Sequence, residues 1–192
     1  MNLFSRLFEL VLRWSRHPKA PWYLGGLSFA ESSFFPIPPD VMLMPMVVAQ
    51  PDKAWRFATI TTVTSVLGGL AGFLIGMLAI DAIMPLLQEL GYWDAYERSQ
   101  LWFKEWGFWA VLAAGFSPIP YKIFTIAAGA MGMPVIPFFF ASLAGRASRF
   151  YLVAGLLSWG GPRVEVTLRR YVDAVGWMVV VLIIVGYFVV RS

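Results

Sequence analysis

Five ionisable side chains lie inside long apolar stretches of this 192-residue sequence. Two are acids, Glu31 and Asp40, and three are bases, Lys122, Arg146 and Arg149. A charge at the centre of a membrane span costs about 2.5–3.5 kcal/mol on insertion scales, so each of these groups needs a partner or a water-filled cavity. Three bases against two acids leave a net charge of +1, which suits an anionic head group.

The spacing of the bases favours phosphate binding. Arg146 and Arg149 stand three positions apart and share a predicted helix face with Ser142. Guanidinium forks bind phosphate through two parallel hydrogen bonds, and a helix that begins after a proline turn adds backbone donors. We therefore expect a substrate-binding site built from Lys122, Arg146 and Arg149, together with Tyr121 and Ser142.

A structural interpretation of the same charges stays open. Glu31 and Asp40 either exchange protons during transport or pair with Arg146 and Arg149 in a buried network. Asp40 follows Pro39 and could also cap the helix that begins there. We favour a functional site for the five charges together, because apolar residues could meet a purely structural need.

Composition excludes several classes of protein. Apolar residues make up 59% of the chain and charged residues 14%, against about 25% charged in soluble domains, which indicates an integral membrane protein. The chain has no cysteine and one histidine, so we expect no metal site, no cofactor and no catalytic triad, and we do not expect an enzyme. The formal charge of +4 is dispersed between apolar spans, which argues against nucleic-acid binding.

Two proline-broken apolar segments must position the charges. Pro36, Pro38 and Pro39 interrupt the first apolar run, and Pro118 and Pro120 interrupt a second one 82 residues later. Proline lacks an N–H and clashes with the preceding turn, so neither segment can be one continuous helix. The arms are too short to span a bilayer, and we expect two re-entrant hairpins. Such paired interruptions are typical of a transporter's binding site.

The remaining segments complete an all-α integral membrane protein with one membrane domain. Each expected repeat is a hairpin followed by a span, Phe57–Ile80 in the first and Phe138–Trp159 in the second. Gly68, Gly72 and Gly76 form a small-residue stripe that predicts close helix packing. The expected parts are an amphipathic interfacial helix over 1–20, repeat 1 over 22–80, an interfacial loop over 81–105, repeat 2 over 106–159 and an additional C-terminal span over 174–190.

The distribution of basic residues tests this layout. If both broken segments re-enter, nine Lys and Arg residues lie on one side of the membrane (Arg6, Arg13, Arg16, Lys19, Lys53, Arg56, Arg163, Arg169 and Arg170) and three on the other (Arg98, Lys104 and Arg191). Basic loops stay in the cytoplasm, so the richer side should be cytoplasmic and should hold the N-terminus. The two repeats would then be inverted with respect to each other.

Both broken segments carry motifs that resemble those of a known family. The first reads Glu31-x4-Pro36-x-Pro38-Pro39-Asp40, and the second reads Gly115-Phe116-x-Pro118, followed by Ala128-Gly129 and Met133. They are similar to the E-x4-P-x-P-G-E/D and F-x-P-x-x-R…A-G-x-x-x-M signatures of the DedA family (VTT-domain, "SNARE-associated" membrane proteins). Gly115 and Tyr121 stand where the family has arginines, with Lys122 one place on, which resembles the YqaA-like branch.

The resemblance implies two facing re-entrant hairpins and activity as a lipid flippase or scramblase, including carriers that recycle undecaprenyl phosphate. The family's acids correspond to Glu31 and Asp40. We therefore expect a multi-pass bacterial inner-membrane protein that moves an anionic lipid, either a polyprenyl phosphate or a phospholipid, with proton uptake by at least one of these acids. The alternatives are a proton-coupled exporter of a small ion or drug and a scaffold that transports nothing. Homo-oligomerisation, direction and coupling stay open.

Overall fold

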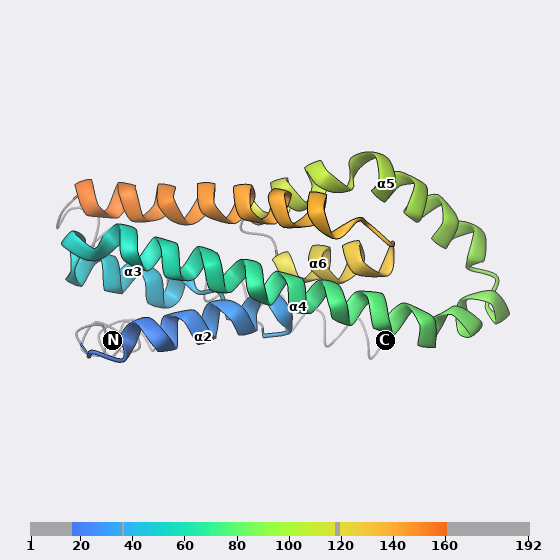
Figure 1. Cartoon of the computed structure of the whole chain (residues 1–192), viewed down its shortest axis with the longest axis horizontal. Helices are drawn as coiled ribbons and strands as arrows, with labels where there is room; N and C mark the ends of the chain where they lie inside the picture. Colours follow the sequence, from blue (N-terminus) through green and yellow to red (C-terminus); the bar gives the residue numbers. More distant parts are fainter. Residues whose placement is uncertain (1–16, 36, 118–119, 161–192) are drawn as a thin grey trace, which may run out of the picture.

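The computed structural model describes residues 17–35, 37–117 and 120–160, and the secondary structure in these ranges is helical. This confirms the all-α class. The elements are α2 (Ala20–Ser33), α3 (Asp40–Ala49), the 3₁₀ turn η1 (Pro51–Lys53), α4 (Ala54–Glu89), α5 (Trp93–Phe116), α6 (Tyr121–Ala130) and a further helix over 135–160 (Figure 1).

The first proline-broken segment is a helical hairpin of α2 and α3. The backbone amides of Phe34 and Phe35 both bond the carbonyl of Ala30, at 2.8 and 2.7 Å, and this shared acceptor ends α2. Pro39 precedes α3 as its N-terminal flanking residue. The predicted break is therefore present. A further proline, Pro45, does not interrupt the chain and lies inside α3.

The boundary before this hairpin differs from the prediction. The amphipathic helix was expected to extend to residue 20, but α2 begins at Ala20 and includes Pro21 in its first turn. A proline is tolerated there because its missing N–H would have no partner inside the helix.

The second proline-broken segment is a hairpin of α5 and α6. The amide of Ser117 bonds the carbonyl of Ala113 at 2.9 Å, and the chain then becomes extended at Ser117. Pro120 precedes α6. The two hairpins approach from opposite ends of the molecule, and both turns lie in its central part (Figure 1).

The predicted first span lies inside a much longer helix. α4 has 36 residues and rises about 54 Å at 1.5 Å per residue, more than a hydrocarbon core of about 30 Å. Among the described residues, Pro51–Glu89 is the one helical stretch that is long and apolar enough to cross a membrane. The second predicted span, Phe138–Trp159, lies within the 135–160 helix.

The expected interfacial loop over 81–105 is helical except at residues 90–92, where Gly91 has a φ of +72°. The rest of the segment continues α4 or begins α5. Contacts at helical spacing support this, since Trp93 donates to Glu97 at 2.9 Å and Arg98 donates to the carbonyl of Asp94. A helix with exposed sides carries polar residues as readily as a loop does, so polarity alone misled the prediction.

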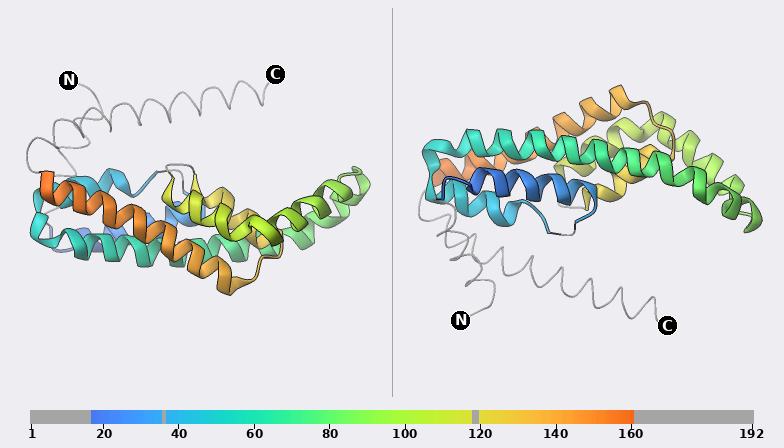
Figure 2. Two further views of the ribbon diagram at one scale, coloured as in Figure 1. Left: turned by 90° about the horizontal axis from the view of Figure 1, so that it is seen from above. Right: turned by 60° about the horizontal axis from the view of Figure 1, so that its bottom comes forward.

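α4 is the element against which both hairpins pack. Glycines at the crossings bring backbones together: Gly68 of α4 lies against Phe29 of α2, and Gly76 lies against Ile126 of α6. The views in Figure 2 show α2 and α6 along the same long helix. The small-residue stripe therefore serves close helix packing, as predicted.

Several predicted features lie outside the described residues. They are residues 1–16 of the expected amphipathic helix, the C-terminal span over 174–190, and two of the turn prolines, Pro36 and Pro118. Re-entry of the hairpins into a bilayer and the inverted relation of the repeats stay predictions.

Candidate functional site

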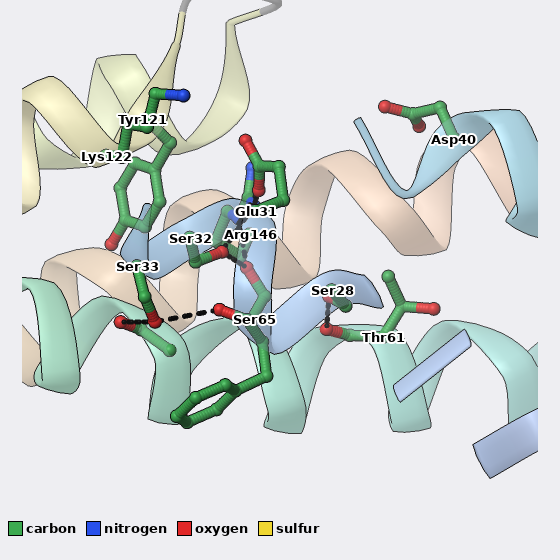
Figure 3. Close-up of polar contacts among 12 residues, drawn as sticks. Ser28, Glu31, Ser32, Ser33, Asp40, Thr61, Ser65, Tyr121, Lys122 and Arg146 are labelled. Atoms are coloured by element: carbon green, nitrogen blue, oxygen red, sulfur yellow. Dashed lines mark hydrogen bonds and ion pairs between the residues drawn. The ribbon is translucent and has the colours of Figure 1, made fainter. Parts of the chain in front are cut away.

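A seam of hydroxyl groups joins α2 to α4. Ser28 donates to the carbonyl of Thr61 at 2.8 Å, and Ser33 donates to the carbonyl of Gly68 at 2.9 Å. Between them, the hydroxyls of Ser32 and Ser65 lie 2.7 Å apart (Figure 3). Sequence reasoning missed this seam. The signal was the four-residue spacing of Ser28 and Ser32, repeated by Thr61 and Ser65, which places both pairs on facing helix sides.

Arg146 lies at the centre of this seam and is 2% exposed. Its guanidinium forms an ion pair with Glu31, donates to Ser65, and donates to Ser32 at 2.8 Å. Ser32 in turn donates to the same Glu31 oxygen at 3.1 Å. The site thus brings the 135–160 helix, α2 and α4 together around one buried ion pair.

Aromatic rings cover the same guanidinium. The Cζ of Arg146 lies 4.5 Å from the ring centre of Tyr121 and 4.9 Å from that of Phe150. The Tyr121 hydroxyl donates to the hydroxyl of Ser142, and both residues are fully buried. Three residues expected to bind substrate, Arg146, Tyr121 and Ser142, therefore bind other groups of the protein.

Arg149 makes a second, separate ion pair. Its Nη2 lies 2.6 Å from Oδ2 of Asp40, and its Nη1 donates to the carbonyl of Ser117. The side chain of Arg149 keeps 17% of its surface exposed. Asp40 lies apart from the Glu31–Arg146 cluster in Figure 3. The two arginines were expected to form one site, but they contact different parts of the two hairpins.

The capping interpretation of Asp40 is wrong. Asp40 is the first residue of α3, the flanking residue is Pro39, and no side-chain hydrogen bond caps this helix. One oxygen, Oδ2, pairs with Arg149. The other, Oδ1, is buried and has no hydrogen-bond partner among the residues that the structure describes. Asp40 is therefore only half satisfied.

Lys122 differs from the two arginines. It stands in the first turn of α6, is partly exposed, and follows Tyr121 directly. Neither of the ion pairs found in the described part of the chain includes its ammonium group. With each arginine matched by one acid, Lys122 supplies the net charge of +1 that the sequence predicted.

The comparisons with known proteins identify a family. The VTT domain matches residues 37–158, which include part of the first hairpin turn, all of the second and the two arginines. A protein of Haemophilus influenzae, described as uncharacterized, is 42% identical over 192 residues and covers all of both chains. A protein of Histophilus somni, described as an uncharacterized HI0703 homolog, is 44% identical over 191 residues, again across the full length of both chains. No solved structure matches the chain. The chain belongs to the VTT-domain family, the DedA family of membrane proteins.

Proposed function

We propose that the protein moves an anionic lipid, a polyprenyl phosphate or a phospholipid, from one leaflet of the membrane to the other. The observation that supports this proposal is an excess of one positive charge among the five ionisable residues that lie inside the apolar stretches of the sequence. Arg149 contacts both turns, and Lys122 begins the helix that follows the second one. A purely structural set of charges would need no unmatched cation among apolar helices.

The first hairpin and α6 of the second have suitable dimensions for re-entry, whereas α5, with 24 residues, rises about 36 Å, so its polar first half must lie outside the hydrocarbon core. α2 has 14 residues and α3 has 10, so they rise about 21 and 15 Å, less than the hydrocarbon core of about 30 Å. We propose that the two repeats are inverted and that their turns meet near the midplane, where transporters with broken helices hold their substrates. A head group could then be reached from either leaflet by a small movement of one hairpin.

The contacts divide the roles among the charged residues. Arg149 and Lys122 are both partly exposed, and Lys122 has no ion-pair partner among the described residues, so we assign these two to the phosphate. Arg146 is enclosed by its partners and holds the helices together. We place proton exchange at Asp40 rather than Glu31, because Asp40 has an oxygen without a partner in the described part of the chain.

The topology can be tested with single cysteines, since the chain has none of its own. Lys53 and Glu97 are both exposed, and they lie near opposite ends of α4, because Lys53 directly precedes this helix and α5, which holds Glu97, begins four residues after it ends. We expect a cysteine at Lys53 to react with an impermeant maleimide from the cytoplasmic side and one at Glu97 to react from the other side. Labelling of both from one side would contradict the inverted re-entrant layout in the inner membrane.

Reconstitution tests the transport itself. Liposomes holding a fluorescent phospholipid or a polyprenyl phosphate should lose their lipid asymmetry faster with the protein than without it. Lys122→Gln should slow this by about tenfold or more, because a hydrogen bond to a charged group contributes about 1.5–3 kcal/mol. Lys104→Gln, which removes an exposed lysine on α5, is the matched control and should keep the wild-type rate.

The two alternatives give different results in the same liposomes. Flux of an ion or a drug driven by a pH gradient, without lipid movement, would favour the exporter. Absence of both movements in folded protein would favour the scaffold.

A further inference from the structure

We propose that the Arg149–Asp40 ion pair is a latch between the two hairpin turns, and that a phosphate monoester head group opens it by taking the place of Asp40 on the Arg149 guanidinium. The inference rests on the proposed lipid transport and adds to it the class of head group and the step that separates the turns. Arg149 is then the residue at which substrate binding and movement are coupled.

The bridge made by Arg149 reaches both hairpins at once. Nη2 binds Asp40, the first residue of α3 in the first hairpin. Nη1 binds the carbonyl of Ser117, the residue that follows the last residue of α5 in the second hairpin. Two adjacent nitrogens of one planar group therefore join the turns, and an anion that accepts from the N–H groups now bonded to Asp40 and Ser117 must displace both of them.

The Glu31–Arg146 ion pair is enclosed by the protein, and we do not expect it to open. Arg146 is 2% exposed, two hydroxyl groups accept from it in addition to Glu31, and two aromatic rings cover it. The Arg149 side chain is 17% exposed, and its polar contacts within the described residues are one carboxylate oxygen and one carbonyl. Arg149 is thus the arginine that an incoming anion can reach.

Asp40 is a weak competitor for Arg149. Its Oδ1 is buried without a hydrogen-bond partner in the described residues, and a buried acceptor left unmatched opposes the closed state. A phosphate monoester carries more negative charge than a carboxylate and offers three oxygens, so it can accept from Nη1 and Nη2 together. Replacement therefore forms a contact to two phosphate oxygens in place of a contact to one carboxylate oxygen, and the freed Asp40 carboxylate must be hydrated in the open state.

The head group's phosphate has different affinities for the closed and the open state, and this difference decides which state it favours. A ligand shifts an equilibrium only as far as it binds one state better than the other. The phosphate binds the guanidinium that has left Asp40 and Ser117, which is the open state. A zwitterionic head group such as choline phosphate, with one negative charge balanced by a positive one, should open the latch far less.

Paired spin labels at the turns can measure the latch. The labels go on cysteines replacing Ile37, which follows the first turn's Pro36, and Phe116, the last residue of α5; both native side chains are exposed. The chain's lack of cysteine keeps other positions unlabelled. The full-length protein is placed in nanodiscs of phosphatidylcholine, with or without dioleoyl phosphatidate, and the distance between labels is measured by electron paramagnetic resonance.

We expect phosphatidate to add a population with a longer distance. Asp40→Asn, which weakens the pair, should show that population in phosphatidylcholine alone. Arg149→Gln should show it in both lipids, with no response to phosphatidate. Arg98→Gln, at an exposed position on α5, is the matched control and should respond as the unsubstituted protein does. If Arg149→Gln does not fold, the proposal is still tested by the label distance in Asp40→Asn and by the response of the unsubstituted protein to phosphatidate.

Two results would overturn the proposal. If the distance between the labels lengthens in Asp40→Asn but does not change with phosphatidate in the unsubstituted protein, the latch exists but phosphatidate does not open it. A distance unchanged in every sample would show no latch at all. Lipid movement measured on the same preparation separates this failure from failure of the proposed function, because transport with a fixed distance contradicts only the latch.

Discussion

Replacing Arg146 with alanine should destabilise the folded protein by about 3–5 kcal/mol, because Glu31 would stay buried without its cation. Ser32 and Ser65 would lose a donor at the same time, and the rings of Tyr121 and Phe150 would face an empty space. Unfolding of the purified protein in detergent with increasing denaturant measures this loss, and low yield from membranes should accompany it.

A second substitution identifies the cause. Adding Glu31→Gln to Arg146→Ala removes the unmatched negative charge, so the double variant should be more stable than Arg146→Ala alone. Arg98→Ala, which removes an exposed arginine on α5, should change stability by less than about 0.5 kcal/mol. If Arg146→Ala keeps wild-type stability and loses transport instead, Arg146 is a substrate ligand, and our division of roles between the arginines is wrong.

The breaks in the chain were predictable because their cause is local. A proline lacks an N–H wherever it stands, so Pro38, Pro39 and Pro120 marked both turns without knowledge of their surroundings. Pro45 and Pro85 show the limit of this rule, since each lies inside a helix. Pro45 is buried, and packing against neighbouring helices can outweigh one missing hydrogen bond there. Pro85 is exposed, and packing does not explain why α4 continues past it.

The sequence predicted that the acids and the arginines could pair, but it did not predict which acid pairs with which arginine. A spacing of three residues places Arg146 and Arg149 on one helix face, which suggested one common site. The same spacing separates them by about 4.5 Å along the axis, enough for one to reach α2 and the other to reach the turns. Which acid each arginine meets depends on where the hairpins end in space, and the sequence contains no local signal for that.

The serine seam and the polar segment over 81–105 show two further limits. An apolar helix that contains a serine has the same sequence pattern whether the hydroxyl bonds a carbonyl of its own helix or one of a neighbouring helix. Ser33 does both, with the carbonyls of Phe29 and Gly68 as acceptors. Polarity likewise reports exposure to water and not backbone conformation, so it could not tell a loop from the ends of α4 and α5.

Gly129→Ala in α6 should have an effect of similar size to that of Arg146→Ala. A Cβ at Gly129 would overlap the backbone carbonyl of Phe73 in α4, and a Cβ at Gly76 would overlap that of Ile126 in the opposite direction. A backbone carbonyl cannot turn away as a side chain can, so the two helices must separate along the crossing. Overpacking of a tight interface costs about 1–3 kcal/mol and sometimes more, and we expect the upper end here. The measurement is again unfolding in detergent.

Gly26→Ala is the matched control, because a Cβ at Gly26 on α2 meets nothing within 4 Å. It should be neutral or stabilising by up to about 1 kcal/mol, since alanine favours a helix more than glycine does. The two substitutions add the same methyl group to a helix, so the difference in sign between them isolates the backbone contact. The position of α6 also fixes Lys122 and Tyr121, which begin that helix. If Gly129→Ala were as stable as Gly26→Ala, α6 could not lie this close to α4, and the positions of Tyr121 and Lys122 relative to α4 would have to change with it.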